Sequence, residues 1–197
     1  MARLRAILFD LGGVLLPFDR ERRIAAIVGR LGVAEADARA FMADDIHRRL
    51  DTGQADEHDL ALAFTALAGH AVSEPEAREL ILSVFEAPNM ALWDLAVSLA
   101  ERLTVGGFSD NPSFVRQVFP QGANLEPMLF SSEIGACKPS AAAFAIAQSR
   151  LAAAPKSILF IDDSAANIDQ ARAMGWEAIL FASNEQLTAQ LRLRGLP

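Results

Sequence analysis

The sequence predicts an α/β fold, a doubly wound parallel sheet that carries an inserted helical segment. From about residue 103 onward, short and nearly continuous apolar runs alternate with helix-like segments, which is typical of strands buried on both faces of a parallel sheet. A run of the same kind, residues 6–9, stands near the start. Residues 18–88 contain no convincing strand and instead show amphipathic helical patterns, so a helical segment is expected to interrupt the sheet after its first strand.

The predicted strands and helices follow one another in the order that a doubly wound sheet requires. The expected strands are 6–9, 104–108, 127–130, 157–161 and 178–181. The expected helices between and after them are 112–118, 139–152, 164–174 and 184–194. Asn111 before Pro112 is a predicted N-cap, and Gly175 follows the helix that Ser164 can open. Strand and helix alternate throughout this half of the chain, so the strands are expected to be parallel.

The inserted segment shows four helical patterns, each with one apolar face. The faces are formed by Ile24, Ile27, Val28 and Leu31; by Met42, Ile46 and Leu50; by Leu60, Ala63, Phe64, Leu67 and Ala68; and by Ala77, Leu80, Ile81, Val84 and Phe85. Ser73 and Glu76 match a capping box that opens the last helix. We therefore expect an α/β core of residues 1–17 and 89–197 and a helical cap of residues 18–88.

Composition narrows the class of protein. The 197 residues include one cysteine, Cys137, so no internal disulfide can form. The net charge of −7 disfavours nucleic acid and anionic membranes as partners. Arg3 and Arg5 precede only four apolar residues before Asp10, too few for the core of a signal peptide, and no apolar run reaches the roughly 18 residues of a membrane span. We expect a soluble, cytoplasmic globular protein.

Polar residues follow the predicted strands at their carboxyl ends, where ligands bind in open parallel sheets. They are Asp10, Ser109, Asp110, Lys138, Asp162 and Asp163. Three carboxylates brought together repel one another unless cations compensate them. Lys138 and a divalent cation can do so, and an oxygen-only ligand set suits Mg²⁺. A carboxylate can also attack phosphorus and form an aspartyl-phosphate, so these residues favour phosphoryl transfer.

At these positions the sequence resembles the haloacid dehalogenase-like (HAD) superfamily, in its phosphatase-like branch with a helical cap of the C1 type. Residues 9–14 (Phe-Asp-Leu-Gly-Gly-Val) resemble its first motif, and 109–111 (Ser-Asp-Asn) its second. Residues 138–139 (Lys-Pro) resemble the third, and 161–164 (Ile-Asp-Asp-Ser), continuing to Asn167, the fourth. The resemblance covers about residues 6–182 and implies a Rossmann-like core.

The resemblance also implies a role for each site residue. Asp10 is the expected nucleophile and a Mg²⁺ ligand, and Asp163 the other side-chain ligand. Asp162, beside Asp163, is counted with the metal site and is expected to orient waters or Lys138. Lys138 is expected to bridge the nucleophile and the phosphoryl group. Ser109 and the backbone N–H of Asp110 are expected to hold phosphoryl oxygens.

Position 12 departs from the family's pattern. Active family phosphatases usually carry an aspartate two residues after the nucleophile, which protonates the leaving group and then activates water, whereas this chain has Gly12. Its backbone carbonyl can still ligate the metal. We therefore expect Mg²⁺ binding to persist without that general acid–base help, which is worth about 10²–10⁴-fold. Members resembling α-glucose-1-phosphatase share the Asp-Leu-Gly sequence, so a selective or slow enzyme is expected.

The predicted function is Mg²⁺-dependent hydrolysis of a small phosphorylated metabolite, such as a sugar phosphate, through an aspartyl-phosphate. The alternatives are a 2-haloacid dehalogenase-type hydrolase and a catalytically impaired binding or regulatory protein. Asp19 could replace the missing acid, but its place before a helix favours an N-cap. Cys137 is expected to be incidental to the chemistry. Three histidines of the insert, His47, His58 and His70, are expected to be solvated or interhelical.

Overall fold

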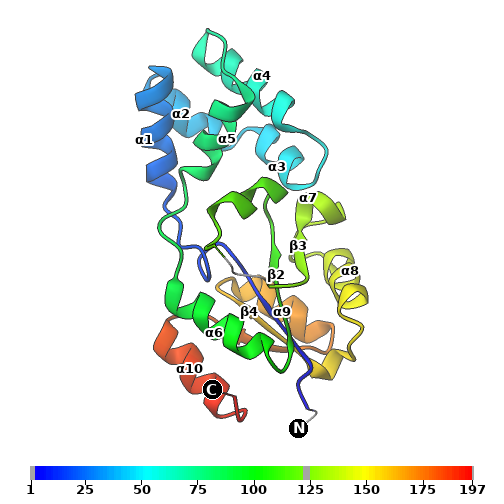
Figure 1. Cartoon of the computed structure of the whole chain (residues 1–197). Coiled ribbons are helices and arrows are strands. Elements are labelled where there is room, and N and C mark those ends of the chain that lie inside the picture. Colours follow the sequence, from blue (N-terminus) through cyan, green and yellow to red (C-terminus); the bar gives the residue numbers. More distant parts are fainter. Residues whose placement is uncertain (1–2, 122–124, 197) are drawn as a thin grey trace.

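A parallel sheet forms the centre of the core (Figure 1), in a computed structural model that describes residues 3–121 and 125–196. Its strands are β1 (Ala6–Phe9), β2 (Thr104–Ser109), β3 (Met128–Phe130), β4 (Ile158–Asp162) and β5 (Glu177–Leu180). They lie in the order β3-β2-β1-β4-β5, and each neighbouring pair is parallel. The predicted fold class is confirmed, with strand limits that differ from the expected ones by a residue or so.

Helices cover both faces of the sheet, as a doubly wound fold requires. Ile7 and Phe9 point to a core shared with α6 (Met90–Ala100) and α10 (Asn184–Arg192). Ala6 and Leu8 point the other way, toward α8 (Ala141–Leu151) and α9 (Ala165–Ala173). Successive side chains of a strand alternate between faces, so the continuous apolar run of β1 reflects two apolar faces.

Each of the two apolar cores beside the sheet contains one tryptophan. Trp93 belongs to the first and Trp176 to the second, and both are buried.

Glycine at 106 permits the close pairing of β2 with the chain before β3, because a Cβ there would lie 2.0 Å from the Pro127 carbonyl oxygen.

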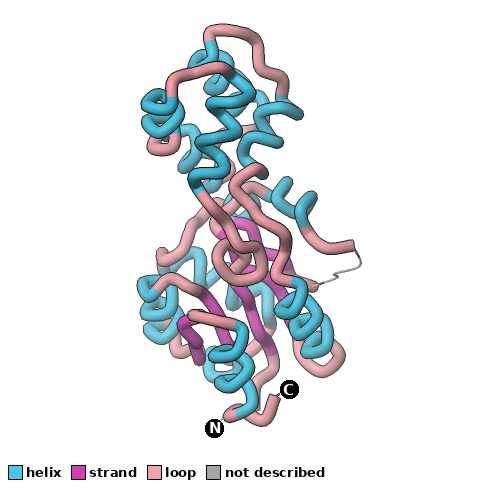
Figure 2. Tube along the Cα trace, turned by 90° about the vertical axis from the view of Figure 1, so that its left-hand side faces the viewer, coloured by secondary structure: helices cyan, strands magenta, loops and turns pink. Residues whose placement is uncertain are grey.

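The inserted segment forms a helical unit above the sheet with an apolar core of its own (Figures 1 and 2). Its helices are α1 (Arg20–Leu31), α2 (Glu35–Phe41), α3 (Asp45–Asp51), α4 (Glu57–Ala68) and α5 (Glu74–Leu82). The expectation of four helices is wrong, because α2 is a separate short helix that buries only Ala38 and Phe41. Met42 follows α2 as its C-cap rather than opening α3.

Two adjacent segments join this unit to the core. The Asp19 N–H donates to the Val84 carbonyl and the Glu86 N–H to the Pro17 carbonyl, each at 2.8 Å. The Asp19 side chain accepts from the Glu21 N–H at 2.8 Å and so caps α1, as expected. Two short antiparallel segments therefore connect the cap and the core.

The connection after β2 differs from the prediction. Residues 113–118 form a 3₁₀ helix, η1 (Ser113–Val118), that follows Pro112, and Asn111 does not cap it. The Asn111 amide instead donates to Ser109 Oγ at 2.9 Å. A short helix, α7 (Ser131–Ile134), follows β3, and a 3₁₀ turn, η2 (Pro155–Ser157), precedes β4; the sequence indicated neither.

No described helix combines the length and the apolar character that crossing a bilayer requires.

Candidate active site

The topology brings the ends of three strands together. β1 lies between β2 and β4, with Phe9 paired to Gly107 on one side and to Ile161 on the other. Asp10 directly follows β1, Ser109 ends β2 and Asp162 ends β4. The chain reverses its direction of winding beside β1, which is where open α/β sheets bind ligands.

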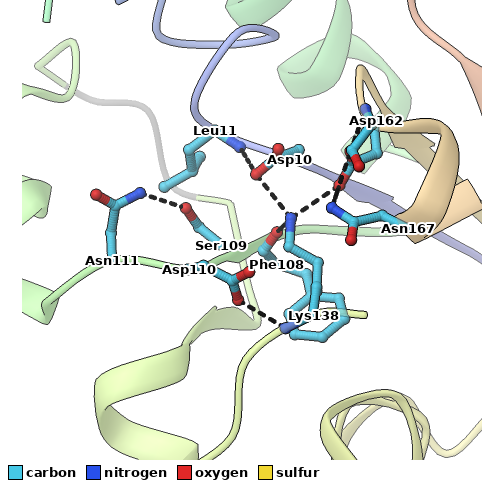
Figure 3. A network of polar contacts seen from close by, with 10 residues as sticks. Asp10, Leu11, Phe108, Ser109, Asp110, Asn111, Lys138, Asp162 and Asn167 are labelled. Carbon is cyan, nitrogen blue, oxygen red and sulfur yellow. Dashed lines mark hydrogen bonds and ion pairs between the residues drawn. The ribbon is translucent and has the colours of Figure 1, made fainter. Parts of the chain in front are cut away.

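Lys138 joins these strand ends through its ammonium group (Figure 3). Nζ lies 2.9 Å from Asp10 Oδ1, 2.8 Å from Asp162 Oδ2 and 2.9 Å from the Phe108 carbonyl oxygen. The lysine side chain is 2% exposed. Burial opposes its charge, but the carboxylates of Asp10 and Asp162 outweigh burial and raise the pKa of Lys138 above its ordinary value. The side chain therefore remains a cation.

Both oxygens of the Asp162 carboxylate accept hydrogen bonds. Its Oδ1 accepts from the Ser164 N–H at 2.7 Å, and the Asn167 amide lies 3.1 and 3.0 Å from its two oxygens. Its Oδ2 also receives Lys138, and the side chain is completely buried. These contacts hold Asp162 in one orientation, in which it fixes the position of the lysine.

Asp10 is buried, and two contacts hold its carboxylate in one orientation. Its Oδ1 accepts from the Leu11 N–H at 2.7 Å as well as from Lys138. Burial raises the pKa of Asp10 to about 7, to which Asp162 adds, while Lys138 acts in the opposite direction. A further cation nearby would favour the charged carboxylate.

Three carboxylates could hold a metal ion at this edge of the sheet. Asp10, Asp162 and Asp163 each offer an oxygen, and these atoms lie within 4.8 Å of one another. Asp163 is the exposed member of the three, and burial together with Asp162 raises its pKa. An oxygen-only set of this kind fits Mg²⁺ or another hard divalent cation.

Glycine at position 13 makes room for this group. Gly13 has a φ of +77°, and a Cβ built on it would lie 2.1 Å from Asp163 Oδ2. A side chain at position 13 would therefore displace the Asp163 carboxylate, so the second glycine of the first motif has a steric reason here.

The loop after β2 contributes two further groups. Ser109 is buried, with its Oγ held by Asn111. The Asp110 side chain accepts from the Lys138 backbone N–H at 2.9 Å (Figure 3). The Asp110 carboxylate thus helps to position the loop that carries Lys138, a contact that the sequence did not indicate.

These residues open into a cavity of about 480 Å³ between the core and the cap, a size typical of small-molecule sites. The core residues in its wall include Asp10, Gly12, Ser109, Asp110, Asn111, Lys138, Asp163 and Asn167. A larger hollow of about 850 Å³ lies elsewhere, beside Leu4, Leu103 and Leu196, and has none of these residues in its wall. We place the site in the smaller cavity because it contains the carboxylates and the lysine.

The cap supplies cavity residues that the sequence analysis missed. They are Phe18, Arg20, Arg23, Met42, His47, Asp51, Val84 and Phe85. Arg20 and Arg23 are three apart on α1, and His47 and Asp51 are four apart on α3, so each pair shares one helix face. That spacing is the signal that could have pointed to a common surface. His47 is partly buried, with Nε2 3.1 Å from the Phe41 carbonyl oxygen.

Comparisons with known proteins find similar sequences and similar folds. Residues 135–195 match the hydrolase family model described as "HAD-hyrolase-like". The D-ribitol-5-phosphate phosphatase of Bacteroides thetaiotaomicron is 24% identical over 186 residues, which cover 88% of this chain and 90% of that protein.

Two solved structures share the fold over nearly the whole chain. A HAD family enzyme of B. thetaiotaomicron, in complex with magnesium and inorganic phosphate, has a TM-score of 0.83 at 23% identity, covering 96% of this chain and 100% of that one. A HAD-like family hydrolase of Porphyromonas gingivalis also has a TM-score of 0.83 at 23% identity, covering 97% and 99%.

A helical cap lies above a parallel sheet, with carboxylates and a buried lysine at the sheet's carboxyl edge, which defines an α/β protein with a candidate active site. Residues 135–195 match the HAD-like hydrolase model, and the fold of the whole chain is similar to that of solved HAD family enzymes.

Proposed function

We propose that the protein is a Mg²⁺-dependent phosphohydrolase that acts on a small phosphorylated metabolite through an aspartyl-phosphate on Asp10. One observation carries the proposal: Asp10 is fixed by Lys138 in the cavity wall, and one of its oxygens lies within 4.8 Å of an oxygen of Asp163. The D-ribitol-5-phosphate phosphatase relative supports a phosphate monoester, and a sugar or sugar-alcohol phosphate is the proposed substrate.

The proposed metal ligands are the side chains of Asp10 and Asp163 and the carbonyl of Gly12. Asp162 lies within reach of the same ion, but its oxygens already accept hydrogen bonds, so we assign it to holding Lys138. When bound, Mg²⁺ supplies positive charge against the phosphoryl oxygens and the attacking carboxylate. The HAD family enzyme solved with magnesium and inorganic phosphate supports Mg²⁺ as the metal.

Each remaining residue has a task that follows from its contacts. Asp10 attacks phosphorus with a carboxylate oxygen. Ser109 Oγ and the Asp110 N–H hold phosphoryl oxygens. Lys138 has three N–H bonds, and three protein oxygens lie within reach of them. Its contribution to the transferred group is therefore its charge rather than a free hydrogen bond.

The cap completes the site. It closes over a cavity of about 480 Å³, which limits the substrate to a small molecule and keeps bulk water from the reacting atoms during the first step.

Phosphate release from a panel of sugar, sugar-alcohol and acyl phosphates, measured with Mg²⁺ and with EDTA, tests the proposal. We expect release that requires Mg²⁺ and is abolished by Asp10→Asn. Asp169→Asn removes an exposed surface carboxylate and is the matched control, with full activity expected. Activity that survives in Asp10→Asn would disprove the nucleophile.

The same proteins test the two alternatives. Metal-independent release of chloride from 2-chloropropionate would indicate a dehalogenase. Binding of beryllofluoride without turnover of any phosphate ester would indicate a binding protein.

A further inference from the structure

Position 12 leaves the proposed reaction without a group that protonates the leaving oxygen. We propose that Asp51, at the end of cap helix α3, is the general acid and base of this site. The inference rests on the proposed phosphohydrolase function and adds a catalytic residue to it. In this arrangement the cap supplies the proton that the first motif of the core does not.

The other carboxylates of the cavity already have tasks. Four line it: Asp10, Asp51, Asp110 and Asp163. Asp10 is the proposed nucleophile and Asp163 a proposed metal ligand, while the Asp110 carboxylate accepts from the backbone N–H of Lys138. Among the described residues, no hydrogen bond or ion pair engages the Asp51 carboxylate, as Asp51 takes part only through its backbone. It is therefore the cavity carboxylate available for proton transfer.

Contacts between cap and core hold the end of α3 beside α7 (Figure 1) and beside the loop that carries Lys138. The Cys137 thiol, next to Lys138, donates to the Asp51 carbonyl oxygen at 3.8 Å. Two residues further on, Gly53 packs so closely that a Cβ there would lie 2.3 Å from the Ser132 carbonyl oxygen. Gly53 has a φ of +69°, so the backbone conformation also favours glycine. The backbone of Asp51 is thus held where the cap meets the loop that carries Lys138.

The surroundings of Asp51 suit a proton donor at neutral pH. Burial raises the pKa of Asp51 to about 7, the nearby Asp110 adds to this, and Arg23 of α1 acts in the opposite direction. A catalytic acid works best with a pKa near the working pH. The other titratable groups nearby suit the role less well, because burial lowers the pKa of His47 to about 4 and raises that of the Cys137 thiol.

The proton balance closes over two steps. In the first step an Asp10 oxygen bonds to phosphorus, the bond from phosphorus to the leaving oxygen breaks, and that oxygen takes the Asp51 proton. In the second step the Asp51 carboxylate takes a proton from water while the water oxygen bonds to phosphorus. The bond between Asp10 and phosphorus then breaks. Inorganic phosphate leaves, and both carboxyl groups return to their starting states.

The test compares two substrates of similar shape with different leaving groups. Phenyl phosphate releases a phenolate that benefits from protonation, whereas p-nitrophenyl phosphate releases an anion that is stable without it. Because kcat/KM reports the steps through leaving-group departure, we expect Asp51→Asn to lower it at least about 10-fold for phenyl phosphate. For p-nitrophenyl phosphate the change should stay within about 3-fold, since general acid help matters least there.

A second substitution tests whether the loss is that of a proton donor. A Cβ at Gly12 would meet the Phe18 ring at 3.6 Å, an ordinary contact, so the backbone there has room for the Cβ of an aspartate. We expect Asp51→Asn combined with Gly12→Asp to recover most of the phenyl phosphate activity, because a carboxyl returns to the first motif. Asp45→Asn removes an exposed carboxylate of the same helix and should change neither substrate.

The outcomes separate this inference from the proposed function. An equal loss on both substrates, an effect on KM alone, or no recovery with Gly12→Asp would overturn the role of Asp51 while leaving Asp10 as nucleophile. Activity of Asp10→Asn toward p-nitrophenyl phosphate would instead refute Asp10 as the nucleophile, on which the proposed function depends. Thermal unfolding checks the fold of each variant. The wild-type phenyl phosphate profile of kcat/KM should also fall above about pH 7, and Asp51→Asn should lose that limb.

Discussion

The contact between Gly13 and Asp163 makes a quantitative prediction for Gly13→Ala. A Cβ at this position would lie 2.1 Å from Asp163 Oδ2 and 2.8 Å from its Cγ, and the backbone φ is +77°. Left-handed backbone costs an alanine about 1–2 kcal/mol, which corresponds to a fall in melting temperature of roughly 2–8 °C for a chain of this size. The displaced Asp163 carboxylate should also weaken Mg²⁺ binding by at least about 10-fold, because even outer partners of metal ligands contribute about 10–100-fold.

Two measurements on matched variants check both parts. Titration calorimetry with Mg²⁺ gives the affinity, and thermal unfolding in EDTA gives the stability without metal. Gly12→Ala is the control, because its Cβ would meet only the Phe18 ring at 3.6 Å, and we expect near wild-type values in both assays. If Gly13→Ala bound Mg²⁺ as tightly as Gly12→Ala, Asp163 would not be the ligand that Gly13 accommodates, and the steric reasoning would be wrong.

Three further predictions concern polar side chains that are buried or partly buried. Lys138→Met leaves two buried carboxylates without their cation, so urea unfolding at pH 7 should show a loss of about 3–5 kcal/mol; a loss under 1 kcal/mol would contradict the ion-pair geometry. Without Mg²⁺, Asp51 stabilises the fold fully below pH 3.8, its unfolded pKa, and this contribution is lost as the pH rises to about 7. The free energy of unfolding, measured from pH 4 to 7, should therefore fall less steeply with pH in Asp51→Asn than in the wild type. An unchanged slope would refute the raised pKa of Asp51. The Asn89 and Asn184 amides exchange two hydrogen bonds of 2.9 and 3.1 Å, so the double-mutant cycle to alanine should give a coupling of about 0.5–3 kcal/mol, with additivity as the contrary result.

The sheet could be predicted from the sequence because its signal is local. An uninterrupted apolar run such as residues 6–9 suits a strand that is covered on both faces, and β1 is such a strand. Where the local signal is weak or ambiguous, the sequence prediction was wrong. Helix α2 buries only two residues, so its periodicity is faint. Asn111 looks like a helix cap, but its amide binds Ser109 instead.

The candidate site was predictable to the extent that topology places it. Polar residues that end parallel strands meet at one edge of the sheet, so Asp10, Ser109 and Asp162 come together wherever the strands are adjacent. The position of Lys138 after the third predicted strand made it a candidate cation for the site, and the resemblance gave its role. Nothing in its local sequence shows that its ammonium reaches two carboxylates and a carbonyl.

The sequence by itself determined which residues are apolar, where each strand ends and which carboxylates follow the strands. Only the tertiary structure decided which part of the cap faces the core. Helix periodicity specifies that one face is buried, but not what it is buried against, so the place of Asp51 in the same cavity as Asp10 depends on how α3 docks. The same docking brings Arg23 and His47 to that cavity. Contacts between segments distant in the chain leave no local pattern, because they depend on the packing of whole elements.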